Sequence, residues 1–583
     1  MIKHSKKRLK IYSIFAILIL FIVAVYSNFS SNSENEVIEL RTEVVQEELI
    51  DYNDYKYMVE QLRRVGDGEI GKPVFLDDPD EIERNEKLYQ KTGFYAVVSD
   101  KISVNRSVPD LRSVECREQK YSNKLPKASI IIIFHNEVLS VLKRTIHSVW
   151  NRSPSSLLHE IILVNDASTE KELYDELQQY VDLNFGKKVK IINLPERKGL
   201  IRTRMEGARS ATGEVLVFFD SHMEVGYNYL PPLLAPIKDN RRISTVPIID
   251  DFDAKNFGYY ELNPTRGVID WMWIFHEIRK ELEDPVMPFS TPIMLGCAFA
   301  IDRKFFIEEL GGYDEQLDIW NGENYELSFK LHLCADGLFE VPCSRVAHTF
   351  REINPSRSWK YDYVARNFKR VAEVWLDDYK EILYARDPEK FENVDPGDLT
   401  LQKKIRRDLN CKPFKHFLDV VAPDMAARYP PLRQVPVFAS GTIKSVANDS
   451  NLCIYAENVP YIDMELTDCY PNLIEPFLPM YWLLTFYKQI SLKSTELCMD
   501  TAGVSLFDCH YEGGNQLFKY DTGTMQIMNN NKNKTVCLTA NHETRKLNFE
   551  ECDEYNDYQR WEFGYVNGTA MQRWDEINDY SNM

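Results

Sequence analysis

The sequence predicts an α/β domain with a mostly parallel sheet, preceded by one membrane-spanning helix and followed by a separate all-β domain. Three observations support this. Short apolar runs alternate with helical patterns between residues 129 and 219, residues 11–29 are uncharged and apolar, and cysteine pairs recur after residue 450. The net charge of −19 argues against a nucleic-acid-binding protein, because such a protein needs a basic face.

The first 29 residues predict a membrane anchor. The apolar run at 11–29 follows a basic segment at 1–10, and 19 helical residues at about 1.5 Å each span roughly 28 Å, close to the thickness of a bilayer core. A cleavable signal peptide is the alternative, but its apolar region usually has about 7–15 residues and ends at an A-x-A site, which is absent here. Because the basic residues precede the span, we expect a type II protein with residues 1–10 in the cytosol.

The residues after the anchor indicate a secretory-pathway protein. The chain has eleven cysteines, which an oxidising compartment allows to pair. Glycosylation sequons stand at Asn28, Asn105, Asn448, Asn533 and Asn567. Residues 30–110 begin polar and acidic with little sustained apolar periodicity, and we assign them to a stem.

Residues 111–424 are predicted to form the α/β domain. Continuous apolar strands are expected at 129–134, 160–164, 188–194 and 214–219, with helices at 138–149, 171–181 and 199–211 between them. Such strands suit a parallel sheet that is covered on both faces. Strands alternating with helices at this spacing predict a nucleotide-type fold.

Polar side chains gather where these strands end, in HNE (135–137), NDAS (165–168) and DSH (220–222). Ligands of open α/β sheets bind beyond the carboxyl ends of the strands. Asp220 and His222 supply one oxygen and one nitrogen ligand, a mixed set that suits Mn²⁺ better than Zn²⁺ or Ca²⁺. His348 is a candidate third ligand, with a packed structural histidine as the alternative, and Arg351 can bind a phosphate.

The end of the chain predicts a trefoil of β-hairpins. Prolines in ARYPPLRQVPVF mark a linker, which we place at 425–440, and residues 441–567 contain three units with similar cysteine spacing. Each such unit is too small to bury a core alone.

Many motifs, in order, resemble those of polypeptide N-acetylgalactosaminyltransferases. They include IIIIFHNE, EIILVNDAS, RKGLIRTRMEGA, FFDSHMEV, TPIMLGCAFAIDR, DIWNGENYELSFKLHLC and PCSRVAHTFR, and the cysteine repeats resemble a ricin-type lectin domain. The resemblance implies an A-type glycosyltransferase fold. It also implies an enzyme that is anchored in the Golgi membrane, with its catalytic part in the lumen. It implies transfer of N-acetylgalactosamine from UDP-N-acetylgalactosamine to Ser or Thr of proteins and glycopeptides, with retention of configuration and Mn²⁺ as cofactor.

The resemblance also assigns roles to residues. Asp220, His222 and His348 would bind the metal, and Trp320, Glu323 and Arg351 would act in catalysis. Substrate binding would fall to His135, Asp166, Arg197, Ser221, Gly296, Trp320 and Arg351. Asp500, His510 and Asn515 would bind sugar in the lectin domain. The implied disulfides are Cys116–Cys343, Cys334–Cys411, Cys453–Cys469, Cys498–Cys509 and Cys537–Cys552, which leaves Cys297 as a thiol.

We expect these site residues to act by positioning the substrates and by stabilising charge, because UDP leaves as an anion. No residue among them is a convincing covalent nucleophile. We favour front-face attack in which the departing phosphate helps to deprotonate the acceptor hydroxyl. A metal hydrolase is disfavoured, because HExxH is absent.

Several departures from the family pattern keep a second reading open. Cys297 replaces a glycine of the sugar pocket, Asn321 replaces the first glycine of the family's W-G-G-E-N motif, and the lid region at 352–363 has no glycine. Only the second lectin repeat keeps its sugar-binding Asp, as Asp500, so at most one repeat is expected to bind sugar. The alternative function is a catalytically weak or inactive homologue that binds glycopeptide or nucleotide-sugar.

Overall fold

The computed structural model describes residues 47–351, 363–433, 437–469, 478–493, 495, 497–510, 513–531, 534–572 and 574. Within these residues no helix is long and apolar enough to cross a membrane. The predicted span at 11–29 and all of the predicted lid at 352–363 except Tyr363 lie outside the described residues.

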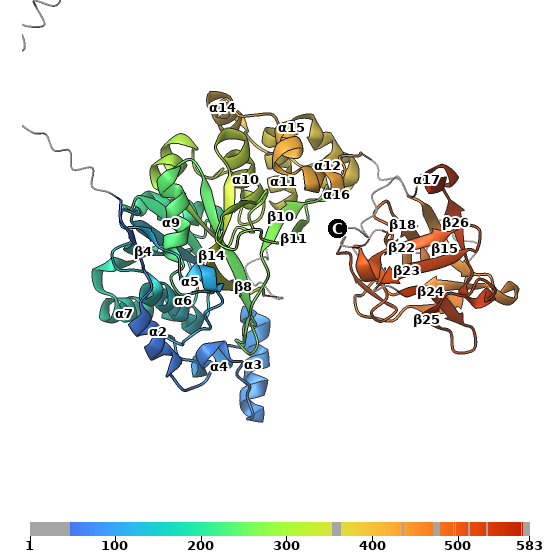
Figure 1. Cartoon of the computed structure of the whole chain (residues 1–583), viewed down its shortest axis with the longest axis horizontal. Helices are drawn as coiled ribbons and strands as arrows, with labels where there is room; N and C mark the ends of the chain where they lie inside the picture. The colour runs from blue at the N-terminus through green and yellow to red at the C-terminus, as the bar shows by residue number, and fades with distance from the viewer. Residues whose placement is uncertain are drawn as a thin grey trace, which may run out of the picture. The chain divides into compact units, whose positions relative to one another are not determined.

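A mixed sheet forms the centre of the first domain (Figure 1), in the order β12-β14-β8-β13-β6-β3-β4-β5. The strands on this path are β12 (Phe289–Ser290), β14 (Leu338–His348), β8 (Ser244–Phe252), β13 (Ala298–Asp302), β6 (Val215–Asp220), β3 (Ala128–Phe134), β4 (Leu158–Asn165) and β5 (Val189–Asn193). Two more strands extend it, β7 (Met223–Val225) beside β14 and β9 (Tyr259–Tyr260) beside β8.

The four strands predicted from the sequence are mutually parallel where they pair, β8 and β14 are also parallel to each other, and the sheet as a whole is mixed. β3 pairs in parallel with β4 and β6, and β4 with β5. β13 runs antiparallel to both of its neighbours, β6 and β8. Since β13 opposes both neighbours, β8 and β14 run in the same direction as β6, and six of the eight strands on the path share one direction. The sheet is therefore mostly parallel, as predicted, with β13 and the short β12 running against the rest.

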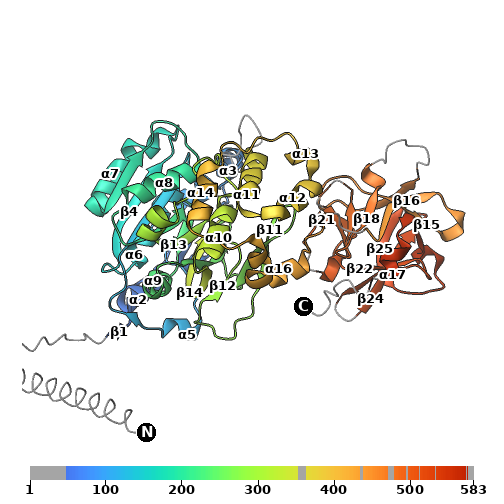
Figure 2. The same cartoon turned by 90° about the horizontal axis from the view of Figure 1, so that it is seen from above.

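Alternate side chains of β3 enter two separate cores. Ile130 and Ile132 pack with α6 (Leu139–Arg152), α7 (Asp175–Asn184) and α9 (Leu230–Asp239). Ile131 and Ile133 pack with α8 (Leu200–Ser210), α10 (Glu323–Cys334) and α11 (Tyr363–Trp375). Figure 2 shows α6 and α9 on one side of the sheet and α8 and α11 on the other. The further helices are α5 (Val114–Arg117), α12 (Lys380–Arg386), α13 (Pro388–Phe391), α14 (Thr400–Asp408), α15 (Phe414–His416) and α16 (Pro423–Arg428), and a hairpin is formed by β10 (Thr265–Ile269) and β11 (Phe275–Arg279).

The folded domain begins well before residue 111. The assigned stem contains α2 (Tyr55–Leu62), α3 (Pro79–Thr92) and α4 (Ala96–Lys101), and β1 (Leu49–Ile50) pairs with β2 (Tyr121–Ser122). Phe94, Val98 and Ile102 are buried against Val141 and Phe257 of the α/β domain. The stem boundary at 110 therefore differs from the structure, because these short helices bury few apolar residues and give only a weak periodic signal.

The second domain is built from antiparallel strands in one 12-stranded sheet. They are β15 (Ala439–Ser445), β16 (Leu452–Tyr455), β17 (Glu465–Asp468), β18 (Trp482–Leu484), β19 (Ile490–Leu492), β20 (Leu497–Asp500), β21 (Ser505–Asp508), β22 (Phe518–Asp521), β23 (Gln526–Asn531), β24 (Lys534–Asn541), β25 (Lys546–Glu551) and β26 (Trp561–Val566), with α17 (Gly568–Gln572) after them. Trp482 and Trp561 are fully buried in its core. The expected linker at 425–440 is shorter in the structure, since Met425 and Tyr429 pack in the core of the first domain.

The five expected disulfides are all present. Cys297 is the free cysteine, and it is buried. Three of the bridges close the hairpins of the second domain, which has a small core of its own.

Candidate active site

A cavity of about 530 Å³ lies where β3, β4, β6 and β14 end at their carboxyl ends. The position agrees with the rule for ligand sites of α/β sheets. Every residue of the α/β domain that was predicted to bind metal or substrate, or to act in catalysis, lines this one cavity: His135, Asp166, Arg197, Asp220, Ser221, His222, Gly296, Trp320, Glu323, His348 and Arg351.

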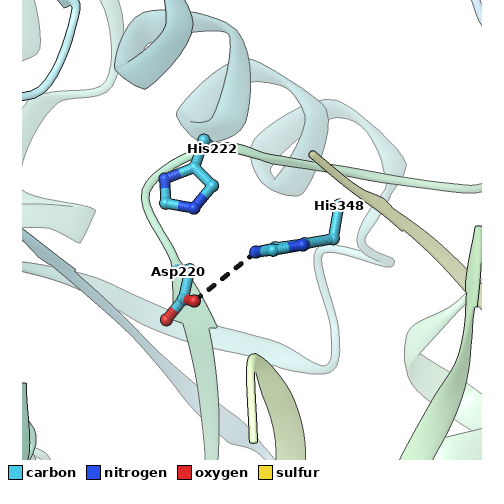
Figure 3. A group of neighbouring side chains, drawn as sticks. All are labelled: Asp220, His222 and His348. Atoms are coloured by element: carbon cyan, nitrogen blue, oxygen red, sulfur yellow. Dashed lines mark ion pairs between the residues drawn. The ribbon is translucent and has the colours of Figure 1, made fainter. Parts of the chain in front are cut away.

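Three of these residues form a candidate metal centre. One ligand atom from each of Asp220, His222 and His348 lies within 4.8 Å of the others. Figure 3 shows the Asp220 carboxylate and the two imidazole rings around a common space, with His348 Nε2 at 3.6 Å from Asp220 Oδ2. Neither ring nitrogen of the buried His348 has a hydrogen-bond partner within the described part of the chain. Buried polar atoms are seldom left in this state, so the donor set fits a bound divalent cation.

The protonation of the centre also suits a metal. Burial and the nearby Arg351 lower the pKa of His222, which keeps its imidazole neutral near pH 7. Burial alone would raise the pKa of Asp220, but His348 and Arg204 outweigh it and hold the pKa below its usual value. A neutral imidazole and an ionised carboxylate are the forms that bind metal.

Glu137 holds His222 in place, a role that the sequence did not reveal. Its Oε2 lies 2.8 Å from His222 Nδ1 and accepts a hydrogen bond of 2.8 Å from the Ser221 hydroxyl. Its Oε1 lies 3.6 Å from an Arg351 nitrogen. Burial opposes ionisation, yet Arg351 and His222 lower the pKa of Glu137 to about 2. A carboxylate that accepts the N–H of the non-ligating ring nitrogen of a metal-binding histidine fixes the ring and its tautomer.

Arg204 holds the carboxylate of the second metal ligand, Asp220, in place. Its guanidinium is 1 % exposed and donates to Asp220 Oδ1 at 2.8 Å. Arg204 comes from α8, whose sequence LIRTRMEGARS contains several charged residues and resembles that of a solvent-exposed helix. The sequence of the helix alone therefore gave no reason to single out Arg204. The contact leaves Oδ2 of Asp220 directed at His348.

His135, which follows β3, and Asp166, which follows β4, lie side by side. His135 Nδ1 is 2.7 Å from the backbone oxygen of Asp166. The Asp166 carboxylate accepts hydrogen bonds from the backbone N–H groups of Lys198 and Gly199, at 2.6 and 2.8 Å. Gly199 has φ +83°, and a Cβ there would lie 2.5 Å from the Ile319 backbone. Only glycine allows this close approach, which carries the chain past Arg197 into α8.

Another wall of the cavity contains Gly296, Cys297, Trp320 and Glu323. Gly296 has φ +98°, and a Cβ there would lie 3.0 Å from Asn324. Glu323 begins α10, is 4 % exposed, and its Oε2 has no hydrogen-bond partner among the described residues. Burial raises the pKa of Glu323 and also that of the Cys297 thiol. Both groups therefore face the cavity in forms that are less readily ionised than usual.

In the second domain, the three predicted lectin residues form one hydrogen-bonded group. Asn515 donates to the Asp500 carboxylate at 2.6 Å, and His510 Nε2 lies 3.1 Å from Asn515 Oδ1. The backbone N–H of Ala502 also donates to Asp500, at 2.7 Å.

Comparison with known proteins agrees with this two-domain organisation. Residues 129–310 match glycosyl transferase family 2, and residues 439–561 match the ricin-type beta-trefoil lectin domain. N-acetylgalactosaminyltransferase 6 of Drosophila melanogaster is 44% identical over 540 residues, which are 90% of this chain and 80% of that protein. Polypeptide N-acetylgalactosaminyltransferase 10 of Homo sapiens is 39% identical over 91% of this chain and 88% of its own.

The chain belongs to the polypeptide N-acetylgalactosaminyltransferase family. A crystal structure of GalNAc-T7 with UDP, GalNAc and Mn²⁺ is similar in fold, with a TM-score of 0.63 and 32% identity over 86% of this chain and 93% of that one. Membership of the polypeptide N-acetylgalactosaminyltransferases confirms the resemblance that the motifs indicated.

Proposed function

We propose that the chain transfers N-acetylgalactosamine from UDP-N-acetylgalactosamine to Ser or Thr hydroxyls of proteins, with retention of configuration, and so initiates mucin-type O-glycosylation. The observation that carries the proposal is the group of Asp220, His222 and His348 in the same cavity as the nucleotide and sugar residues. The family membership and the GalNAc-T7 structure with UDP, GalNAc and Mn²⁺ support the donor and the metal.

Mn²⁺ held by the three ligands would supply positive charge beside the diphosphate of the leaving UDP. The chain adds Arg351, whose guanidinium lines the cavity and lies 3.6 Å from the Glu137 carboxylate. Arg197 and the Ser221 hydroxyl lie in the same cavity, so charge that develops on the diphosphate meets several fixed donors. Fixed donors in a closed site stabilise such charge more strongly than water does.

The nucleotide and the sugar are assigned to separate parts of the cavity wall. His135 and Asp166 would hold the uridine, and their geometry is fixed by the backbone of Lys198 and Gly199. Trp320, Glu323 and Gly296 would hold the sugar, and Glu323 Oε2, which has no hydrogen-bond partner among the described residues, would accept a hydrogen bond from a sugar hydroxyl. The acceptor hydroxyl then attacks on the face that the diphosphate leaves, and the departing phosphate accepts its proton.

The second domain would guide the enzyme to glycopeptides through Asp500, His510 and Asn515. We further propose a type II Golgi membrane protein with its catalytic part in the lumen, from the predicted anchor at 11–29 and the family.

Mass spectrometry of an acceptor peptide tests the transfer. Incubation with UDP-N-acetylgalactosamine and Mn²⁺ is expected to add one N-acetylhexosamine mass to a Ser or Thr, and chelation of Mn²⁺ to stop it. The alternative of an inactive binding homologue predicts UDP binding without any mass addition, over a panel of bare and glycosylated peptides.

A further inference from the structure

A second cavity, of about 190 Å³, lies at the far end of α6 from the active site. Residues 52–54, 57–58, 151–155 and 227–228 line it, and Figures 1 and 2 both show α2 close to α6. Glu137, just before α6, lines the active-site cavity, whereas Arg152 ends the helix and lines the second one. A helix of 14 residues is about 21 Å long at about 1.5 Å per residue, so the two cavities are separate.

Two side chains in this wall are buried without full hydrogen bonding. Asn228 is 6 % exposed, and neither its Nδ2 nor its Oδ1 has a partner within the residues described. Arg152 is also 6 % exposed; its terminal nitrogens donate to the backbone oxygens of Val225 and Arg106, at 2.8 and 2.6 Å, but its Nε has no partner there. Leaving one such group unpaired costs about 1–3 kcal/mol, so native proteins fill such spaces with water or a ligand.

The charges in the wall select a neutral occupant. Arg152 presents a guanidinium, and Asp54 presents a carboxylate that already caps α2. Because the wall carries one charge of each sign, its net charge favours neither an anion nor a cation. The Asn228 amide, which has no partner in the described part of the chain, offers a donor and an acceptor together, as does the buried hydroxyl of Tyr57. Hydroxyl groups both donate and accept, and they match this set.

The size and the remaining walls narrow the occupant further. A volume of 190 Å³ equals about six waters at about 30 Å³ each, and lies below the roughly 300–1,000 Å³ of sites for drug-sized ligands. The rings of Tyr57 and Tyr227, with centroids 6.3 Å apart, add apolar surface beside their polar tips. We propose that this cavity binds a single neutral polyhydroxylated molecule, of the size and chemistry of one monosaccharide.

A plug at the cavity mouth tests the proposal. Ser155 is exposed in the turn after α6 and lines the cavity, whereas the neighbouring Ser156 is exposed and does not line it. Ser155→Trp should therefore block the cavity, and Ser156→Trp is the matched control. Both are made in the full-length chain carrying Asp500→Ala, in a detergent without a sugar headgroup, to remove binding at the lectin group. Neither Ser155 nor Ser156 lines the first cavity, so any sugar bound there contributes equally to both variants.

The probes are N-acetylgalactosamine, N-acetylglucosamine and mannose, followed by ligand-observed saturation-transfer NMR. At least one is expected to bind, with affinity lowered tenfold or more by Ser155→Trp and unchanged by Ser156→Trp. If Ser155→Trp does not fold, Asn228→Asp replaces it, since it keeps the size of the side chain and removes the amide donor. The proposal is overturned if no probe gives a signal that these variants lower, or if a crystal soaked with the sugars shows only water in the cavity. Neither result bears on transfer at the first cavity.

Discussion

Replacing Glu137 by glutamine tests whether this buried carboxylate orients the metal ligands. Glu137 accepts hydrogen bonds at 2.8 Å from Ser221 and at 3.1 Å from the Val138 backbone, and its Oε2 lies 2.8 Å from His222 Nδ1. Glutamine has almost the same shape but only one acceptor oxygen. Whichever way the amide is turned, its NH₂ group faces a donor, and the Arg351 charge loses its partner at 3.6 Å.

The expected loss follows from these contacts. A hydrogen bond that involves a charged group contributes about 1.5–3 kcal/mol. Loss of the group that orients a metal-binding histidine typically lowers metal affinity about 10–100-fold, or about 1.4–2.7 kcal/mol. The two ranges overlap, so we expect Glu137→Gln to weaken Mn²⁺ binding by about 10–100-fold, with transfer lowered at limiting Mn²⁺ and partly restored by excess Mn²⁺.

Calorimetric titration of Mn²⁺ in the presence of UDP measures the effect directly. Glu170→Gln is the control, because Glu170 pairs with Lys91 at 2.9 Å on the exposed surface, where ion pairs contribute little. A Mn²⁺ dissociation constant within about twofold of the unmodified chain would refute the orienting role of Glu137. A loss of transfer that excess Mn²⁺ does not restore would refute it as well.

Three further predictions concern other parts of the molecule. Asp220→Ala should abolish transfer while circular dichroism shows an intact fold, because its side chain is 19% exposed in the cavity rather than packed in the core. Asp500→Ala should leave rates on bare peptides unchanged and lower those on glycopeptides, whereas equal losses on both would indicate a structural defect. Glu160→Gln should destabilise the fold by about 1–3 kcal/mol at pH 7, since Lys190, Thr212 and Ser129 lower the pKa of the buried Glu160 to about 2 against the effect of burial. A lowered folded-state pKa stabilises above the ordinary value of 4.5, so this difference should shrink as the pH of urea unfolding falls from 4.5 towards 2.

The site residues at the strand ends could be predicted because two features of the sequence coincide there, an apolar run and a group of polar residues directly after it. Apolar runs locate β3, β4 and β6, and the polar residues that follow them must meet at one edge of the sheet. His348 ends β14, which pairs with β7 and β8; the apolar pattern did not place this strand in the sheet, and the assignment of His348 needed the family resemblance. β13 escaped prediction as an antiparallel strand, because burial does not record strand direction.

The groups that orient the ligands could not be predicted, because their contacts join distant parts of the chain. Glu137 lies 85 positions before His222, and Arg204 lies 16 before Asp220 on a helix that looks solvated. A buried charge is stable only beside its partner. The identity of each partner is therefore a property of the folded cavity, whereas the ligands themselves follow strands that the sequence marks.

The segment before residue 111 illustrates the same point at the metal centre. Phe94, fully buried, has its ring centroid 5.9 Å from that of His222, and the Arg351 guanidinium lies 5.0 Å from the Phe94 centroid. Arg351 also donates to the backbone oxygen of Thr92 at 3.4 Å. A cation over an aromatic face is held there by about 0.5–2 kcal/mol. Residues that the sequence assigned to a stem thus contact Arg351 and His222 directly. The catalytic domain therefore includes α3 and α4.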